Sequence, residues 1–229
     1  SRKLGVEGED LDGVMHGVDY LRRVNLGEPL NLGRNVVVVG GGNVAIDVAR
    51  TALRTGSDKV FILYRRTKKE MPASQAEIHH LEEEGVKIEF LAAPVKIHGE
   101  NGKLTKIECI RMVLGECDAS GRCRPVPVAD SNFMIEADSI IPAISQDVEH
   151  MTDAETKLAL SRWNTFEVDE ITMQTSVDWI FAGGDAVLGP QTAAKAAYQG
   201  KEAAESIIRY LEGRDLTEGR IPEVEETKE

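Results

Sequence analysis

Cysteine is scarce in this 229-residue chain, which has only Cys109, Cys117 and Cys123. An odd number without repeating short spacings argues against the disulfide framework of a small secreted protein, so we expect a reducing, cytoplasmic location. Cys117 and Cys123 flank a turn-like stretch, where a disulfide or a metal clip is conceivable. The sequence favours neither, because the four-ligand sets of zinc and iron–sulfur centres are missing. We therefore expect no metal site.

Long apolar runs and positive charge are also in short supply. Hydrophobic residues make up 41% of the chain and aromatic residues 5%, and no run approaches the roughly 18 apolar residues that a membrane-spanning helix needs. The net charge of −12 argues against the clustered basic face that nucleic acids require. These absences exclude a membrane span and a general nucleic-acid binder, and they predict an ordinary globular protein with a solvated acidic surface.

Catalytic side-chain motifs are missing as well. The chain has neither a nucleophile elbow nor a C-x-x-C pair. His79 and His80 lie in a polar, glutamate-rich segment, where a solvated helix face is a better explanation than a metal site because no third ligand is evident. We therefore expect no catalytic side chain, with chemistry supplied by cofactors and with position and electric field supplied by the protein.

A parallel βαβ unit is the first positive signal in the sequence. Residues 36–39 are consecutive valines, which predict a short strand buried on both faces. Three glycines follow, then a mainly apolar helix over residues 43–55 that stops at Gly56, and a second strand over residues 60–64. This order of strand, glycine turn, helix and strand is typical of a βαβ crossover in a parallel sheet.

The remaining segments predict further α/β structure with an antiparallel excursion. The Asn101-Gly102 pair is the favoured two-residue hairpin turn, and a second turn over residues 118–121 continues the meander. Residues 223–229 form an acidic tail that we expect to be disordered. Helices are expected over residues 14–23, 73–84 and 192–211, and strands over residues 86–91, 95–98, 104–114, 139–141 and 179–181.

The glycine turn carries the strongest chemical signal. Its residues fit G-x-G-x-x-A directly after a strand and at a helix start, and they are Gly40, Gly41, Gly42, Asn43, Val44 and Ala45. Gly40 permits the tight turn, Gly42 lets the backbone approach a pyrophosphate, and the small Ala45 lets helix and strand pack closely. The N-terminus of the helix favours an anion. This context predicts a dinucleotide site rather than a merely structural turn.

Two arginines follow the second strand. An NAD-specific site would place an acidic residue about 20 positions beyond the glycine turn, to bind the ribose 2′-hydroxyl. Arg65 and Arg66 occupy that place instead, and guanidinium groups form charge-assisted bonds with a 2′-phosphate. The pattern favours NADP(H) over NAD(H), although solvated arginines are also common at strand ends.

A glycine pair and an aspartate, Gly183, Gly184 and Asp185, form the other informative group. They precede Gln191 and Thr192 at the start of an alanine-rich helix. A carboxylate in this place can hold a ribityl hydroxyl, and the helix N-terminus can stabilise an anionic reduced flavin. Because Gly-Gly-Asp is also a frequent turn, the residues alone leave a flavin role and a purely structural role open.

Together these segments resemble the small subunit of NADPH-dependent glutamate synthase and its relatives among the two-dinucleotide flavoproteins. The motifs are residues 35–50, 64–66, 70–73, 167–169, 174–176, 180–185 and 189–192. The resemblance implies an α/β fold, with a Rossmann-type NADPH domain and its antiparallel meander inserted in the remainder of a FAD domain. The implied divisions are residues 1–31 (FAD domain), 32–144 (NADPH domain), 145–212 (FAD domain again) and 213–229 (acidic tail).

The resemblance also implies an activity and the residues that serve it. Hydride would pass between NADPH and FAD, and electrons would then reach iron–sulfur clusters or a large-subunit partner. Residues 40–45 with Arg65 and Arg66 would hold NADPH, and Gly184, Asp185, Gln191, Thr192 and Ala193 would lie at FAD. Ala143 and Ile144 match the start of the family's Ala-Ile-Gly cofactor segment, where Ser145 replaces the glycine.

Two family features are missing from these residues. The FAD domain's own G-x-G-x-x-G turn and the cysteine-rich cluster-binding region are not found. We therefore expect the chain to be a piece of a larger oxidoreductase, to bind NADPH and not to retain FAD. The alternative is a nucleotide-binding or assembly module without turnover of its own.

Overall fold

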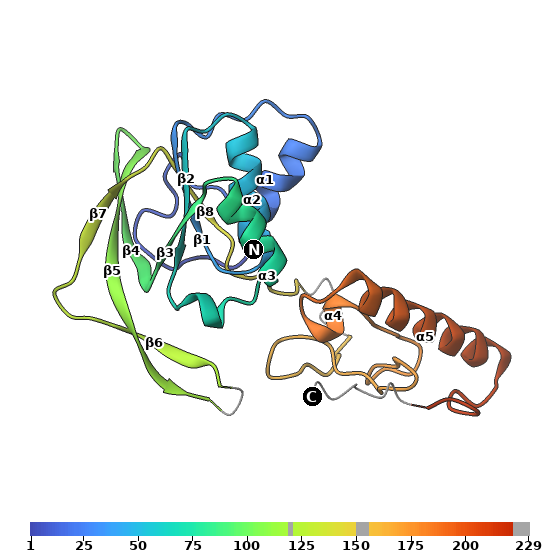
Figure 1. Cartoon of the computed structure of the whole chain (residues 1–229). Coiled ribbons are helices and arrows are strands. Elements are labelled where there is room, and N and C mark those ends of the chain that lie inside the picture. Colours follow the sequence, from blue (N-terminus) through green and yellow to red (C-terminus); the bar gives the residue numbers. More distant parts are fainter. Residues whose placement is uncertain (119–120, 150–155, 222–229) are drawn as a thin grey trace. The chain divides into compact units, whose positions relative to one another are not determined.

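The computed structural model describes residues 1–118, 121–149 and 156–221 (Figure 1). The chain divides into two compact units, Ser1–Ile144 and Ser145–Glu229, which are described separately below. The first unit contains α1 (Gly17–Asn25), β1 (Asn35–Val39), α2 (Asn43–Arg54), β2 (Lys59–Tyr64), the 3-10 helix η1 (Lys68–Glu70), α3 (Gln75–Glu83), β3 (Lys87–Phe90), β4 (Ala92–Glu100), β5 (Lys103–Cys117), β6 (Cys123–Pro127), β7 (Phe133–Glu136) and β8 (Ser139–Pro142). The second contains α4 (Asp185–Leu188) and α5 (Ala193–Glu212).

A four-stranded parallel sheet forms the centre of the first unit, with the strand order β3-β2-β1-β8. The valine strand β1 lies between β2 and β8, and Val37 is paired with Phe61 on one side and with Ile140 on the other. A central strand of this kind is buried on both faces, which explains why its sequence is continuously apolar rather than alternating. The Rossmann-type α/β fold predicted from the sequence is confirmed.

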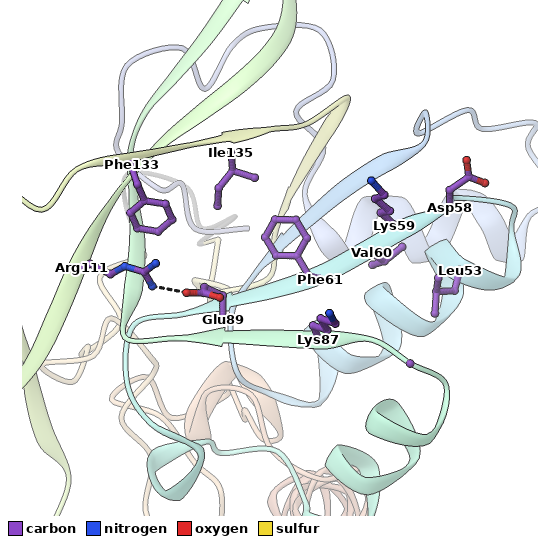
Figure 2. A pocket seen from close by; sticks show the side chains of 11 residues that line it. Leu53, Asp58, Lys59, Val60, Phe61, Lys87, Glu89, Arg111, Phe133 and Ile135 are labelled. Atoms are coloured by element: carbon purple, nitrogen blue, oxygen red, sulfur yellow. Dashed lines mark hydrogen bonds and ion pairs between the residues drawn. The ribbon is translucent and has the colours of Figure 1, made fainter.

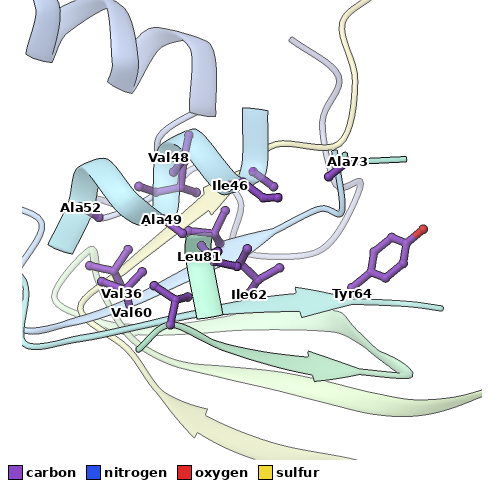
Figure 3. Packing of buried hydrophobic residues seen from close by; sticks show 14 of the residues in the cluster. Val36, Ile46, Val48, Ala49, Ala52, Val60, Ile62, Tyr64, Ala73 and Leu81 are labelled. Atoms are coloured by element: carbon purple, nitrogen blue, oxygen red, sulfur yellow. The ribbon is translucent and has the colours of Figure 1, made fainter. Parts of the chain in front are cut away.

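Two layers cover this sheet. Val36 and Val38 pack on the side of α1, α2 and α3, whereas Val37 and Val39 pack on the side of the antiparallel strands. Figure 3 shows the helix-side packing, in which Ile46 and Ala49 of α2 face the sheet. Each fully buried valine contributes about 1.5–3 kcal/mol relative to an exposed one, so the alternation fixes which face each strand residue takes.

The antiparallel meander consists of β4 to β7. β4 and β5 pair across the Asn101-Gly102 turn, where both residues have positive φ angles of 53° and 80°. These values fit the turn type that the sequence predicted. β5 also pairs with β6 and β7, and Cys117 is linked to Cys123 by a disulfide at the end of the β5–β6 ladder.

The disulfide corrects the expectation that these cysteines are free. The two residues lie directly opposite in the antiparallel register, which brings their side chains within bonding distance. Sequence spacing alone does not reveal this register, because a shift between Leu114 and Cys117 sets it. Cys109 remains a free, buried thiol whose burial raises its pKa to about 12.

The first 31 residues pack within the first unit. Isolated bridges join Glu7 to Lys96 and Val14 to Ile140. α1 begins at Gly17, three residues later than the sequence predicted, because Val14 is engaged in its bridge. Tyr20 is fully buried between α1 and its neighbours, and its hydroxyl lies 3.0 Å from the Thr55 hydroxyl oxygen.

The second unit is built mainly from turns and helices. The strand expected over residues 179–181 is wrong: Phe181 forms only an isolated bridge with Gln174, and Ile180 donates to the Val177 carbonyl in a turn. Trp179 is 65% exposed, so the apolar run reflects local packing rather than a buried strand. The acidic tail predicted over residues 223–229 lies outside the described residues. Among the helices in the described ranges, none is long and apolar enough to cross a bilayer.

Candidate functional site

The glycine turn lies at the carboxyl end of β1 and is closed by close backbone contacts. A Cβ atom on Gly40 would lie 2.3 Å from the Ala143 carbonyl oxygen, and the φ angle of this residue is 153°. A Cβ on Gly41 would lie 2.4 Å from the ring of Tyr64. Side chains are therefore excluded at both positions by neighbouring protein atoms.

Gly42 differs from these two glycines because the space beside it is open. A Cβ there would meet only Pro72, at 3.8 Å. Gly42 is the N-cap of α2 and offers no side chain, so the first N–H groups of the helix are available to a ligand. This geometry fits a backbone that must approach an anion, as the motif predicted.

The first turn of α2 presents the other motif residues. Ala45 is fully buried, which lets the helix pack closely on the sheet, and Val44 is 38% exposed. The Asn43 amide oxygen accepts a bond of 3.1 Å from the backbone N–H of Ser74. Asn43 therefore ties the glycine turn to the segment before α3.

A short loop braces the turn from the side of β2. The Tyr64 hydroxyl donates to the Glu70 carbonyl oxygen at 2.6 Å, and the Ala73 N–H donates to the Gly41 carbonyl oxygen at 3.2 Å. Glu70 caps this loop through the Thr67 hydroxyl, a bond that lowers the pKa of the carboxyl group. Sequence reasoning missed the role of Tyr64, although an aromatic residue at the end of the second strand was the available signal.

Arg65 and Arg66 directly follow β2 and lie at the same sheet edge as the glycine turn. The parallel register pairs Val39 with Leu63, and the Gly40 N–H donates to the Leu63 carbonyl oxygen at 3.1 Å. Carboxyl ends of neighbouring parallel strands meet at one edge, where open α/β sheets bind their ligands. The structure thus brings the predicted phosphate-binding turn and the predicted arginines together.

Electrostatics distinguish these arginines from others in the first unit. Partial burial lowers the pKa of Arg65, and the positive charges of Arg66 and Arg122 lower it further. The Arg66 Nε donates to the Cys123 carbonyl oxygen at 2.8 Å. Lys68, in contrast, is neutralised by Glu82 at 2.6 Å and adds little free charge to the site.

Ala143 and Ile144 follow β8 at the same sheet edge. The Ala143 N–H donates to the Val39 carbonyl oxygen at 2.8 Å, and its own carbonyl faces Gly40. Ile144 is 40% exposed and ends the first unit. Ala143 therefore shapes the turn through its backbone.

The remaining predicted residues lie together in the second unit. The Gly184 N–H donates to the buried Gln199 side-chain oxygen at 2.7 Å, and Asp185 Oδ1 accepts from the Gln191 N–H at 3.3 Å. Thr192 caps α5 by accepting from the Lys195 N–H at 3.3 Å. Asp185, Gln191, Thr192 and Ala193 are exposed around this helix start. Gln199, which sequence reasoning missed, is the residue that fixes the turn at Gly184.

A separate cavity of about 520 Å³ lies between β2, β3 and the meander (Figure 2). It shares no residue with the glycine turn or the arginine pair. Arg111 in this cavity is ion-paired with Glu89 and stacks over the Phe133 ring at 4.1 Å. Its cation is already compensated, so the cavity offers different chemistry from the sheet edge.

The histidines of α3 bring no metal site into view. His79 lies 3.3 Å from Glu83 on the exposed side of the helix. Among the residues with described positions, no group of three metal-ligating side chains is found.

The first unit has the fold of a Rossmann-type domain with an antiparallel excursion. The family model for pyridine nucleotide-disulphide oxidoreductases matches residues 1–200, and the chain belongs to this family of oxidoreductases. The family resemblance predicted from the sequence is confirmed.

Relatives with curated functions are similar along most of the chain. The sequence is 44% identical over 214 residues to the β subunit of an NADP(+)-dependent formate dehydrogenase from Moorella thermoacetica, and the match covers 92% of this chain and 30% of that protein. It is 40% identical to the β subunit of an NADPH-Fe(3+) oxidoreductase from Geobacter sulfurreducens, with 93% and 35% covered. It is 37% identical to the NADPH glutamate synthase small chain of Azospirillum brasilense, with 93% and 47% covered. The chain thus spans less than half the length of these relatives.

Solved structures show the same fold. FprA of Mycobacterium tuberculosis in complex with NADPH superposes with a TM-score of 0.76 at 18% identity, covering 93% of this chain and 62% of that one. Thioredoxin reductase of T. acidophilum gives a TM-score of 0.71 at 20% identity, covering 92% and 62%. These similarities establish the architecture.

Proposed function

We propose that this chain is the NADPH-binding part of a flavoprotein oxidoreductase that passes hydride between NADPH and FAD. One observation carries the proposal: the open Gly42 cap of α2 and the Arg65-Arg66 pair lie at the same edge of the parallel sheet. The relatives named for NADP(+) or NADPH support the choice of nucleotide.

Two groups of residues at this edge would bind different phosphates of the nucleotide. The backbone of Gly42 and the N-terminus of α2 would hold the pyrophosphate, since unpaired N–H groups and the helix dipole both favour anions. Arg65 and Arg66 would bind the 2′-phosphate through charge-assisted bonds. An NADH molecule lacks that phosphate and would lose these bonds, so the arginines would set the preference for NADPH.

The second unit offers residues that fit a flavin. Asp185 is exposed beside the N-terminus of α5, where Thr192 caps the Lys195 N–H and where Thr192 and Ala193 are both exposed. A carboxylate can bind ribityl hydroxyls, and the helix dipole favours the negative charge of a reduced ring. FAD supplies the hydride-accepting and hydride-donating chemistry when bound, and these residues would orient it. We propose that the flavin domain includes residues 145–212; the assignment of residues 1–31 to it rests on the resemblance alone.

The electrons would continue to an iron–sulfur cluster or to a larger partner subunit. Two relatives are β subunits and another is a small chain, which supports assembly with a partner. A cytoplasmic location stays a prediction. It was argued from the lack of a disulfide framework, and the Cys117–Cys123 disulfide weakens that argument.

A nucleotide-binding or assembly module is the second candidate. The observation that favours it is the single G-x-G-x-x-A turn within these 229 residues, which leaves the flavin pyrophosphate without an equivalent turn in the chain. Under this candidate the chain binds NADPH but remains colourless.

Calorimetric titration with NADPH and NADH, together with an absorbance scan for flavin, tests the proposal. We expect wild-type protein to prefer NADPH and the Arg65→Ala/Arg66→Ala variant to bind it roughly 30- to 100-fold more weakly, because two charged contacts are lost. Binding of NADH should change by less than about threefold. A yellow protein that NADPH bleaches supports turnover, and a colourless NADPH binder supports the module.

Arg54→Ala is the matched control. Arg54 lies on the same helix as the nucleotide cap but at its opposite end, paired with Glu84 and 63% exposed. Its loss should leave both affinities unchanged. Equal binding of NADPH and NADH by the wild-type chain would contradict the NADPH assignment.

A further inference from the structure

A third arginine belongs to the surroundings of Arg65 and Arg66. Arg66 donates to the carbonyl oxygen of Cys123, so the first residue of β6 lies against Arg66. Arg122 directly precedes this acceptor and is exposed. This bond joins the Arg66 side chain to the backbone of a residue 57 positions later in the chain, and Arg122 is the direct neighbour of that residue.

Two hydrogen bonds with Asp118 hold the backbone of Arg122 in place. The Arg122 carbonyl oxygen accepts from the Asp118 N–H at 3.1 Å, and its N–H donates to Asp118 Oδ1 at 3.1 Å. The Cys117–Cys123 disulfide closes the hairpin around this pair of bonds. Because this backbone is already fixed, binding through Arg122 would need to order only its side chain and not the loop.

The three arginines form a concentration of positive charge. In the described part of the chain, no ion pair involves Arg65, Arg66 or Arg122. Other arginines are compensated, such as Arg111 by Glu89 and Arg220 by Glu202. Like charges held together are unfavourable unless an anion joins them.

We propose that Arg122 is a specificity-determining residue that supplies a third cation to the 2′-phosphate of NADP(H). The inference rests on the proposed function, because it assumes that Arg65 and Arg66 bind this phosphate. Its distinct content is that the β5–β6 hairpin, and not the βαβ unit alone, contributes to the choice between the two nucleotides. Arg122 is outside the segment where nucleotide preference is usually sought.

The test compares Arg122→Ala with Arg124→Ala in the whole chain, using NADPH, NADH and the fragment 2′,5′-ADP as titrants. Arg124 is another exposed arginine on the same hairpin, so it controls for general electrostatic attraction. We expect Arg122→Ala to weaken NADPH and 2′,5′-ADP about 5- to 10-fold and to leave NADH unchanged. Arg122→Lys, which keeps the charge, should restore part of the loss.

The outcomes separate this inference from the proposed function. If Arg65→Ala/Arg66→Ala weakens NADPH but Arg122→Ala does not, the third cation is wrong and the NADPH site stands. Equal losses in Arg122→Ala and Arg124→Ala also overturn the assignment, since the hairpin would then act only through its net charge. If the wild-type chain binds NADPH and NADH equally, the proposed function itself fails.

Discussion

The two predicted cofactor regions are built differently. In the first unit, the glycine turn and Arg65 are positioned by a parallel sheet whose strands pair with one another along four to five residues. In the second unit, the turn at Gly184 is positioned by one buried side chain, Gln199, and by the start of α5. A sheet distributes its constraint over many backbone bonds, whereas a side-chain bond concentrates it in one residue.

The glycines of the first unit provide the largest expected effect. Gly40→Ala would force a Cβ to within 2.3 Å of the Ala143 carbonyl oxygen, and we expect it to destabilise the first unit by about 2–4 kcal/mol. Gly42→Ala meets only Pro72 and should leave stability nearly unchanged while weakening NADPH binding at least tenfold. Hydrogen exchange of the β1 amides and calorimetry measure the two effects.

This pair of variants also tests the division between structural and ligand-binding glycines. Both substitutions add one methyl group to the same turn, so they control for each other. Loss of stability in Gly42→Ala, or normal β1 exchange protection in Gly40→Ala, would contradict the assignment of roles.

Loss of the Gln199 bond should destabilise the second unit, by less than Gly40→Ala destabilises the first. Gln199→Leu leaves the buried Gly184 N–H without its acceptor, which costs about 1–3 kcal/mol. Both tryptophans of the chain, Trp163 and Trp179, lie in this unit, so fluorescence during denaturation follows it selectively. Gln199→Glu keeps an acceptor oxygen and should retain more stability than the leucine variant. Identical midpoints for all three proteins would show that the bond contributes nothing.

The same contrast explains what the sequence could predict of the fold. The valine strand, the glycine turn and α2 were predicted because each has a local pattern: β-branched residues, paired glycines and helical periodicity. The strand expected over residues 179–181 failed because its apolar residues have no neighbouring strand to pair with in the described ranges, and β structure depends on such partners. The packing of residues 1–31 within the first unit could not be predicted either, since isolated bridges leave no periodic pattern in the sequence.

The candidate site was predicted as far as its parts are local in sequence. Gly42, Arg65 and Arg66 belong to one βαβ unit, and their spacing is set by that unit's geometry. Tyr64 and Gln199 act on glycines that are 23 and 15 positions away, so no short motif includes them. The place of Arg122 depends on the register of β5 and β6, which an irregularity between Leu114 and Cys117 shifts. No sequence motif marks that irregularity.

Two aspartates offer the smallest and most selective comparison between the units. In the first unit, Asp138 Oδ2 accepts from the N–H groups of Arg34 and Asn35 at 2.9 and 2.8 Å, across more than 100 residues. In the second, Asp169 Oδ1 accepts from the N–H groups of Ile171 and Thr172 at 3.0 and 2.8 Å, only two and three residues away. These backbone bonds lower the pKa of each carboxyl group.

Asp138→Ala should therefore cost more than Asp169→Ala, because an unfolded chain can still form local turn bonds but not the long-range ones. We expect about 1 kcal/mol for Asp138 and about half of that for Asp169, measured by amide exchange near each site at neutral pH. A carboxyl group with a lowered pKa in the folded state stabilises the protein above its unfolded pKa of about 3.9, and the contribution is lost as pH falls through the folded pKa. The difference between wild-type protein and Asp138→Ala should accordingly shrink below about pH 4. A difference that stays constant down to pH 2 would mean that Asp138 acts through packing against Gly33 rather than through its charge, and that the long-range anchor of the first unit is steric.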